Sequence, residues 1–247
     1  ESSHSLPHFN IKINPGIILF FKILSLGLFV LTIVSGLFGS QSAIDNFGTN
    51  FFWIIFLLGF TYLSAIFGNI WQVINPFKTI LSLFGDTKPM FTYPKKLGYF
   101  PALIFYLLLI WMELLSGGIG VKPNILSQIL LLYTTITFSG VIIFGQDWFK
   151  YGEFFSVFFG LIGKLSPFGK QTDVLKDKPN HFSLLLFILF MLSSTAFDAF
   201  RATSTWFRFY YNNISPFENL LGENGYQIAQ TVLLLLSPLF FLSFYFL

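Results

Sequence analysis

The chain has 247 residues, of which 54% are hydrophobic and only 10% are charged, and its net charge at pH 7 is +3. Its mean hydropathy is +0.72. Soluble globular domains carry about 25% charged residues, so this composition excludes a soluble enzyme, a disordered chain and a fibrous repeat. It predicts an all-α, polytopic integral membrane protein whose first partner is the lipid bilayer, and the small net charge does not indicate nucleic-acid binding.

Six stretches of the chain meet the requirement of about 20 mostly apolar residues for a membrane-spanning helix. They cover residues 15–38, 51–75, 99–117, 124–146, 182–201 and 226–247. We therefore expect a single transmembrane helical domain over residues 1–247, built as a bundle of about six spans. The last stretch has no polar flank and the first residues show neither Met nor a signal pattern, so we expect both ends to be truncated.

The basic residues alternate between the connections of these six spans. Eleven of the 14 Lys and Arg residues lie in the N-terminal segment, in the start of the first span or in the loops 76–98 and 147–181. Cytoplasmic loops of membrane proteins are rich in Lys and Arg. The pattern predicts that the N-terminus and these two loops lie on the cytoplasmic side of the membrane.

Two shorter apolar segments lie within the predicted cytoplasmic loops. Residues 153–165 have polar residues on one helical face and Phe, Val, Leu and Ile on the other, and the segment 76–85 is similar. Both are too short to cross a bilayer, so we expect one or two interfacial helices on the cytoplasmic surface. Trp71 and Trp148 fall at the same inner boundary, where Trp prefers the headgroup level.

Charged side chains within membrane spans are costly, and each is a candidate for a functional site. Glu113 lies near the outer end of the third span, and Asp198 and Arg201 close the fifth span at the same level. Asp198 and Arg201 are three residues apart, so they share a helical face and can pair. This outer charge cluster has two interpretations. It is structural, either an interhelical ion pair or helix ends that lie in the hydrated headgroup region, or it is a proton relay, ion site or acid–base pair.

A polar stripe follows the second span near its inner end. It consists of Ser64, Gly68, Asn69 and Gln72. The spacing of Ser64 and Gly68 is typical of small residues that allow two membrane helices to approach closely. The alternative interpretation is a narrow polar path.

The sequence indicates no catalytic and no metal-binding residues. It contains no cysteine, and its three His are His4, His8 and His181, too scattered for a typical zinc site. Whether the protein binds a cofactor, and of which type, is unknown from the sequence.

Several short motifs together have the order found in a known family. They are Ser35-Gly36-Leu37-Phe38-Gly39, Gly68-Asn69-Ile70-Trp71, Asn75-Pro76, Tyr93-Pro94, Trp111 with Glu113-Leu114, Gly152-Glu153-Phe154-Phe155-Ser156, and Phe197-Asp198. In this order they resemble the bacterial multi-pass membrane proteins catalogued as fenitrothion hydrolase-like. The resemblance implies cleavage of an organophosphate ester and draws attention to Glu113, Glu153 and Asp198. Phosphotriester hydrolysis usually needs a metal-activated water, and the sequence shows no cluster of His and carboxylates that predicts a metal site.

Three functions are therefore compatible with the sequence. The scarcity of intramembrane polar groups favours a non-catalytic subunit embedded in a larger membrane complex, with other membrane protein subunits as partners. A transporter or channel would need a polar route that joins the outer charge cluster to the inner polar stripe. A membrane-bound organophosphate hydrolase is the function that the resemblance implies, although we lean against an enzyme.

Overall fold

The computed structural model describes residues 14–83, 89–167 and 181–245. The described residues are helical, with turns and no strand, which confirms the predicted all-α class. Most of the predicted cytoplasmic N-terminal segment lies outside them, as do residues 84–88 of the loop 76–98 and 168–180 of the loop 147–181. The helices form two compact units, which we describe separately.

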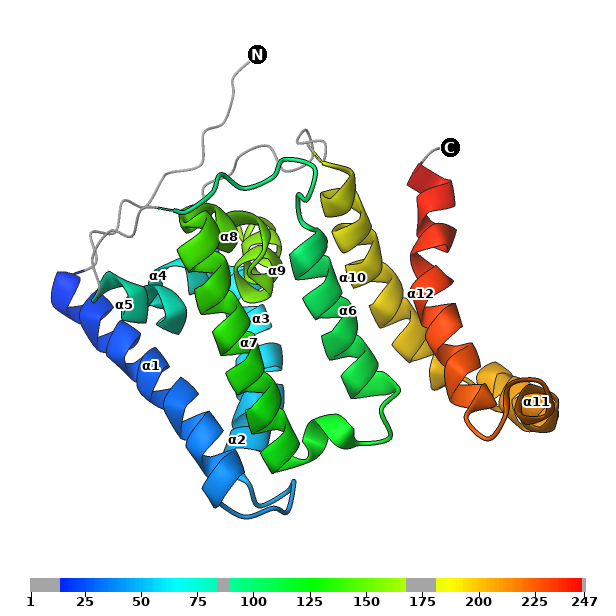
Figure 1. The fold of residues 1–247 in the computed structure, drawn as a ribbon. Helices are drawn as coiled ribbons and strands as arrows, with labels where there is room; N and C mark the ends of the chain where they lie inside the picture. The colour runs from blue at the N-terminus through cyan, green and yellow to red at the C-terminus, as the bar shows by residue number, and fades with distance from the viewer. Residues whose placement is uncertain (1–13, 84–88, 168–180, 246–247) are drawn as a thin grey trace. The chain divides into compact units, whose positions relative to one another are not determined.

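Unit 1 combines residues Glu1–Thr92 and Lys122–Lys178. Its elements are α1 (Pro15–Phe38), α2 (Phe47–Asn50), η1 (Phe51–Gly59), α3 (Phe60–Phe67), α4 (Trp71–Ile74), α5 (Pro76–Ser82), α7 (Pro123–Phe144), α8 (Gln146–Tyr151) and α9 (Phe154–Gly163). Within this unit α1 packs along α7, and α9 packs against α3 and α4 (Figure 1).

Unit 2 combines residues Tyr93–Val121 and Pro179–Leu247. Its elements are α6 (Phe100–Leu114), the 3-10 turn η2 (Ile119–Val121), α10 (Phe182–Arg201), α11 (Ser204–Leu221) and α12 (Gly225–Tyr245). Helix α10 packs against both α6 and α12. Helix α11, which Figure 1 shows end-on, runs across the direction of α10 and α12.

Among the residues that the structure describes, five helical segments are long and apolar enough to cross a bilayer. They are Pro15–Phe38, Phe47–Phe67, Pro123–Phe144, Phe182–Arg201 and Gly225–Phe244. The chain is therefore a multi-pass membrane protein. The predicted span 99–117 is represented by α6, whose 15 residues extend about 22 Å at 1.5 Å per residue, less than the roughly 30 Å of a bilayer core.

The second span begins and ends earlier than the predicted 51–75. It starts at Phe47, where the side chain of Asn46 accepts a hydrogen bond from the Thr49 amide. It stops at Phe67 because Gly68 adopts a φ of +93°, which ends the helix. The apolar composition continues past this point, so hydropathy alone could not locate the stop.

The middle of this span, η1, is a nine-residue π-helix. A π-helix has a wider turn than an α-helix and is often found at functional sites. Here it accompanies a row of rings: Phe52 lies 5.9 Å from Phe56, and Phe56 lies 6.1 Å from Phe60, measured between ring centroids. The row faces the interior of unit 1, where Phe56 and Phe60 contact Trp71.

Helix α9 differs from the expected interfacial helix. Its side chains Phe154, Phe155, Val157 and Phe159 are buried within unit 1 instead of facing lipid. The reason is that α3 and η1 offer rings that match its apolar face: Phe159 lies 4.9 Å from Phe60 between ring centroids.

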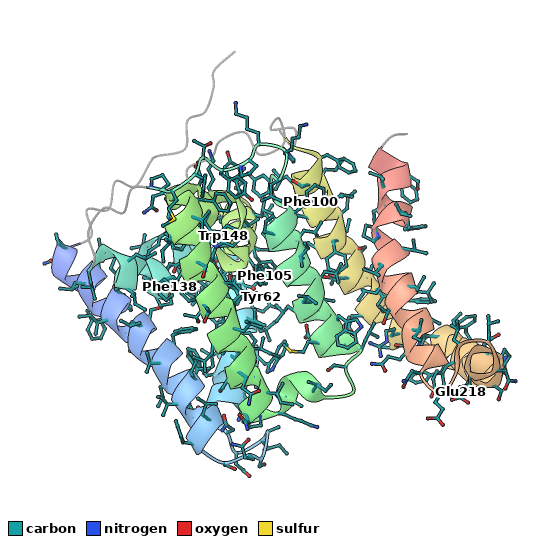
Figure 2. The ribbon with its side chains drawn as sticks, viewed as in Figure 1. Tyr62, Phe100, Phe105, Phe138, Trp148 and Glu218 are labelled. Carbon is teal, nitrogen blue, oxygen red and sulfur yellow. The ribbon has the colours of Figure 1, made fainter. Side chains whose placement is uncertain are left out.

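Two other segments also differ from the sequence-based expectation. Trp71 and Trp148 are buried in unit 1 and do not lie at an exposed boundary; the ring of Trp148 (Figure 2) packs where Cβ atoms on Gly140 and Gly152 would overlap it. The connection 202–225, between the last two predicted spans, contains α11. The N-cap of α11 is Thr203, whose hydroxyl accepts a hydrogen bond from the Trp206 amide. Glu218 is exposed on α11 (Figure 2).

Candidate functional site: a buried carboxylate beside an aromatic cavity

Among the described residues of unit 1, Glu153 is the most deeply buried ionisable side chain, with an exposed fraction of 0%. It occupies the N-cap of α9, and its carboxylate accepts hydrogen bonds from the backbone amides of Phe155 (3.1 Å) and Ser156 (2.8 Å). A carboxylate at this position satisfies amides that have no partner within the helix and interacts favourably with the helix dipole. The sequence therefore favours a carboxylate at this helix start.

Three side chains from outside α9 donate to the same carboxylate. The Tyr133 hydroxyl of α7 donates to Oε1. The Trp71 indole nitrogen and the Asn75 amide nitrogen approach Oε2 at 3.5 Å and 3.4 Å. With the two backbone amides, five donors surround two oxygens that together offer about four lone-pair positions. The carboxylate is therefore saturated by the protein itself.

Asn75 also organises the start of α5. Its side-chain oxygen accepts hydrogen bonds from the amides of Phe77 (2.9 Å) and Lys78 (3.2 Å), while its amide group points to Glu153 and to the Ser156 hydroxyl. One amide side chain thus joins the start of α5 to the start of α9.

Lys78 contributes a positive charge that interacts electrostatically with Glu153. Its ammonium group lies 5.2 Å from the centroid of the Phe149 ring. Burial lowers the pKa of Lys78, and the negative charge of Glu153 opposes part of that effect.

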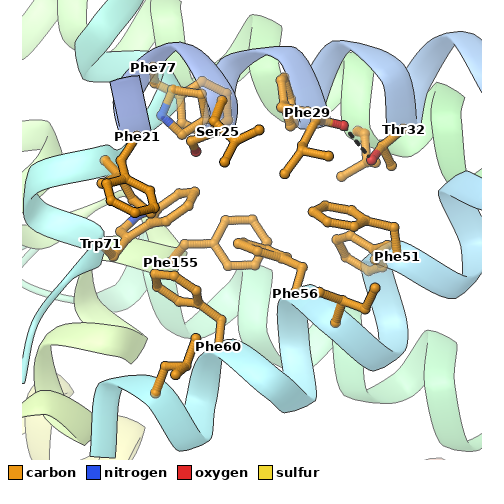
Figure 3. Close-up of a pocket in the computed structure, with 18 residues that line it drawn as sticks. Phe21, Ser25, Phe29, Thr32, Phe51, Phe56, Phe60, Trp71, Phe77 and Phe155 are labelled. Atoms are coloured by element: carbon orange, nitrogen blue, oxygen red, sulfur yellow. Dashed lines mark hydrogen bonds between the residues drawn. The ribbon is translucent and has the colours of Figure 1, made fainter. Parts of the chain in front are cut away.

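An apolar cavity of about 180 Å³ lies in the same unit, between α1 and the helix that contains η1 and α3 (Figure 3). Eighteen residues line it, and nine of them are aromatic: Phe21, Phe29, Phe51, Phe52, Phe56, Phe60, Trp71, Phe77 and Phe155. Trp71 and Phe155 contribute both a ring to the cavity wall and a hydrogen bond to Glu153. The buried carboxylate and the cavity therefore share a wall.

The outer charge cluster predicted from the sequence lies in unit 2. Glu113 is near the end of α6, and Asp198 and Arg201 are in the last turn of α10, which packs against α6. The carboxylates of Glu113 and Asp198 are close enough to interact electrostatically. Arg201 donates from Nη1 to the Leu114 carbonyl at 2.9 Å. The structure thus brings the three residues to one region of unit 2, where the guanidinium group of Arg201 bonds to a backbone carbonyl.

The predicted inner polar stripe is divided by the turn at Gly68. Ser64 is fully buried on α3, whereas Asn69 accepts a hydrogen bond from the Gln72 amide at the start of α4, and Gln72 is exposed. A Cβ on Gly163 of α9 would lie only 2.5 Å from the Asn69 nitrogen. Small residues therefore permit close packing here, and the four residues do not continue along one helix.

The sequence-based candidates omitted Trp71, Asn75 and Tyr133, and Glu153 drew attention only through the resemblance. A usable signal was present: Asn75 precedes Pro76, and Glu153 precedes an apolar run, and both patterns are typical of helix starts. The sequence could not show that these two helix starts lie side by side, because 78 positions separate Asn75 from Glu153.

Within the part of the chain that the structure describes, no group of three or more His, Asp or Glu side chains is arranged to hold a metal ion. The chain matches no protein-family model, and no curated protein or solved structure is significantly similar to it. Fold and site therefore define the class, a multi-pass α-helical membrane protein, and the resemblance to fenitrothion hydrolase-like proteins stays a prediction.

Proposed function

We propose that this chain is a non-catalytic, membrane-embedded subunit of a larger complex in the bacterial cytoplasmic membrane. Its N-terminal segment and the loops 76–98 and 147–181 lie on the cytoplasmic side, and its partners are other membrane protein subunits and lipid.

The observation that carries this proposal is the saturation of Glu153. A carboxylate that functions as a base, a nucleophile or a transport site needs a lone pair that a substrate or proton can reach. Both oxygens of Glu153 are engaged by donors of the protein, and the side chain is fully buried. The arrangement supports a role in holding α5, α7 and α9 together.

The short α6 supports the assignment to a complex. A helix of about 22 Å cannot match a bilayer core of about 30 Å by itself. Such a mismatch is relieved by local thinning of the bilayer, by snorkelling of flanking side chains or by association with other helices. Association with partner subunits would cover the ends of α6.

The test is purification of the tagged full-length protein from native membranes in a mild detergent. We expect other membrane proteins to co-purify at a fixed stoichiometry. A monomer that moves ions or solutes across reconstituted vesicles would instead favour the transporter or channel. Hydrolysis of a phosphotriester by the metal-supplemented protein, lost in Glu113→Gln without loss of folding, would favour the membrane-bound organophosphate hydrolase.

The proposed orientation has its own test because the sequence contains no cysteine. Single substitutions Lys95→Cys and Lys150→Cys should react with a membrane-impermeant maleimide only when the cytoplasmic face is accessible. Lys122→Cys should react from the opposite side. Labelling of Lys95→Cys and Lys122→Cys from the same side would contradict the orientation.

A further inference from the structure

The aromatic cavity of unit 1 has a chemistry that indicates its occupant. We propose that it binds the hydrocarbon chain of a membrane lipid, which enters between α1 and the helix formed by η1 and α3. This inference goes beyond the proposed function and does not depend on it.

The inner wall of the cavity is fixed by hydrogen bonds (Figure 3). The indole nitrogen of Trp71 donates a hydrogen bond to the Glu153 carboxylate, and the backbone amide of Phe155 donates to the same carboxylate. Phe77 is fully buried, and its amide is bonded to the Asn75 side chain. These bonds hold the Trp71 ring and the backbone that carries the Phe77 and Phe155 rings, and they therefore oppose an inward movement of the wall that would fill the cavity.

The lining offers almost nothing to a polar ligand. Besides the apolar and aromatic side chains, only Ser25 and Thr32 carry hydroxyl groups, and the Thr32 hydroxyl donates to the Leu28 carbonyl at 2.8 Å. Apolar cavities of this size stay dry, and one of about 150 Å³ accommodates benzene. A cavity of about 180 Å³ therefore suits a segment of roughly six or seven carbon atoms, which is part of an acyl chain and excludes a headgroup.

The mouth of the cavity faces the surface that lipid covers. Four lining side chains are strongly exposed: Phe21 (47%), Leu24 (41%), Ile55 (58%) and Leu63 (44%). They belong to α1 and to the segment Phe47–Phe67, both long and apolar enough to cross the bilayer. A chain entering from the hydrocarbon core would reach the cavity without passing through water.

The experiment uses the full-length protein in phosphatidylcholine nanodiscs that contain a small fraction of phosphatidylcholine with a diazirine at the end of one acyl chain. After illumination, cross-linked peptides are identified by mass spectrometry. We expect cross-links to concentrate on the cavity residues of α1 and η1, above the level on lipid-facing positions outside the cavity.

Two substitutions on α1 form a matched pair. Ser25→Phe places a ring in the cavity, and we expect it to reduce the cavity cross-links about tenfold. Gly27→Phe adds the same ring two positions further along α1, where a Cβ has no atom within 4 Å. For this variant we expect the cavity cross-links to change less than twofold. Leu63→Trp, which narrows the mouth from an exposed position, provides a second obstructing variant if Ser25→Phe does not fold.

An even distribution of cross-links around α1, unchanged by folded Ser25→Phe or Leu63→Trp, would overturn the proposal and leave only the ordinary lipid layer around the helix. Loss of cross-links in Gly27→Phe to the same extent as in Ser25→Phe would also overturn it.

Discussion

Glu153 in unit 1 and Glu113 in unit 2 are the same residue type in opposite environments. Glu153 is fully buried and accepts five hydrogen bonds. Glu113 is exposed near the end of α6 and interacts with a second acid, Asp198. One carboxylate therefore stabilises the contacts among several helices, whereas the other adds like charge to its neighbourhood.

The difference shows that the position of a charged residue inside or outside an apolar stretch of the sequence does not by itself reveal its role. A carboxylate removed from water is tolerated when donors replace its hydration. The residues around Glu153 provide those donors from four separate segments, whereas Arg201 of unit 2 donates to the Leu114 carbonyl. The following predictions test whether this contrast is energetic as well as geometric.

The largest effect is expected for Glu153→Gln. The new side-chain amide nitrogen at position 153 would face the donors that now bond to the carboxylate. Lys78 would also lose the negative charge of Glu153, which opposes the effect of its burial. We expect a loss of about 3–5 kcal/mol in the free energy of unfolding, the usual cost of breaking a buried charged network. Denaturant unfolding in detergent, followed by Trp fluorescence, measures it. The matched control is Glu113→Gln, expected to change stability by less than about 1 kcal/mol; equal losses in the two variants would remove the contrast.

A smaller loss is expected for Gly163→Ala. The added Cβ would lie 2.5 Å from the Asn69 nitrogen and 2.9 Å from the Asn69 Cα, and backbone atoms cannot move aside as a flexible side chain can. Overpacking of this kind costs about 1–3 kcal/mol. Gly27→Ala, where the Cβ meets open space, should instead raise stability by up to about 1 kcal/mol through helix propensity. If both variants unfolded at the wild-type denaturant concentration, the contact between α3 and α9 would be looser than described.

In unit 2, Asp198→Asn should be neutral or stabilising. The substitution removes one of two like charges and takes a negative charge away from the C-terminal turn of α10, a position that disfavours anions by about 0.3–1 kcal/mol. Thermal unfolding monitored by circular dichroism measures the change. Arg201→Gln is the reciprocal variant and should destabilise, because its bond to the Leu114 carbonyl is lost. A strong destabilisation by Asp198→Asn would indicate that the acid has a favourable partner, as Glu153 does.

The smallest effect concerns the pH dependence of stability through Lys78. Burial lowers its pKa below the ordinary value of 10.5. Between the lowered pKa and 10.5 the unfolded chain binds more protons at this site than the folded chain, so the free energy of unfolding rises with pH in that window. Lys78→Arg keeps its proton throughout, and the stability difference between wild type and Lys78→Arg should shift in favour of the wild type as pH approaches 10.5. A difference that stays constant from pH 7 to 10.5 would place Lys78 in a solvated environment.

Sequence reasoning predicted the membrane spans well where hydropathy and helix boundaries coincide. The predicted 15–38 and 182–201 are the observed α1 and α10. It failed at Gly68, where a positive φ ends the helix inside an apolar run. It also missed α11 in the connection 202–225, because this helix is less apolar than a membrane span and contains Pro216.

The candidate site was predictable only in part. Glu113, Asp198 and Arg201 were placed in one region because helix ends can be counted along the chain. The surroundings of Glu153 depend on contacts between residues about 80 positions apart, such as Trp71 and Glu153. No local pattern encodes such a contact, so the site of unit 1 required the folded structure.

The π-helix η1 also constrains how this sequence can change. Its wide turn is equivalent to extra chain inserted into an otherwise α-helical rod, so deleting a single residue such as Gly59 would restore ordinary α-helical winding. The helix would still be long and apolar enough to insert into a membrane, but Phe52 and Phe56 would rotate away from Phe60 and Trp71. Substitutions within η1 are therefore expected to accumulate more readily than changes of its length.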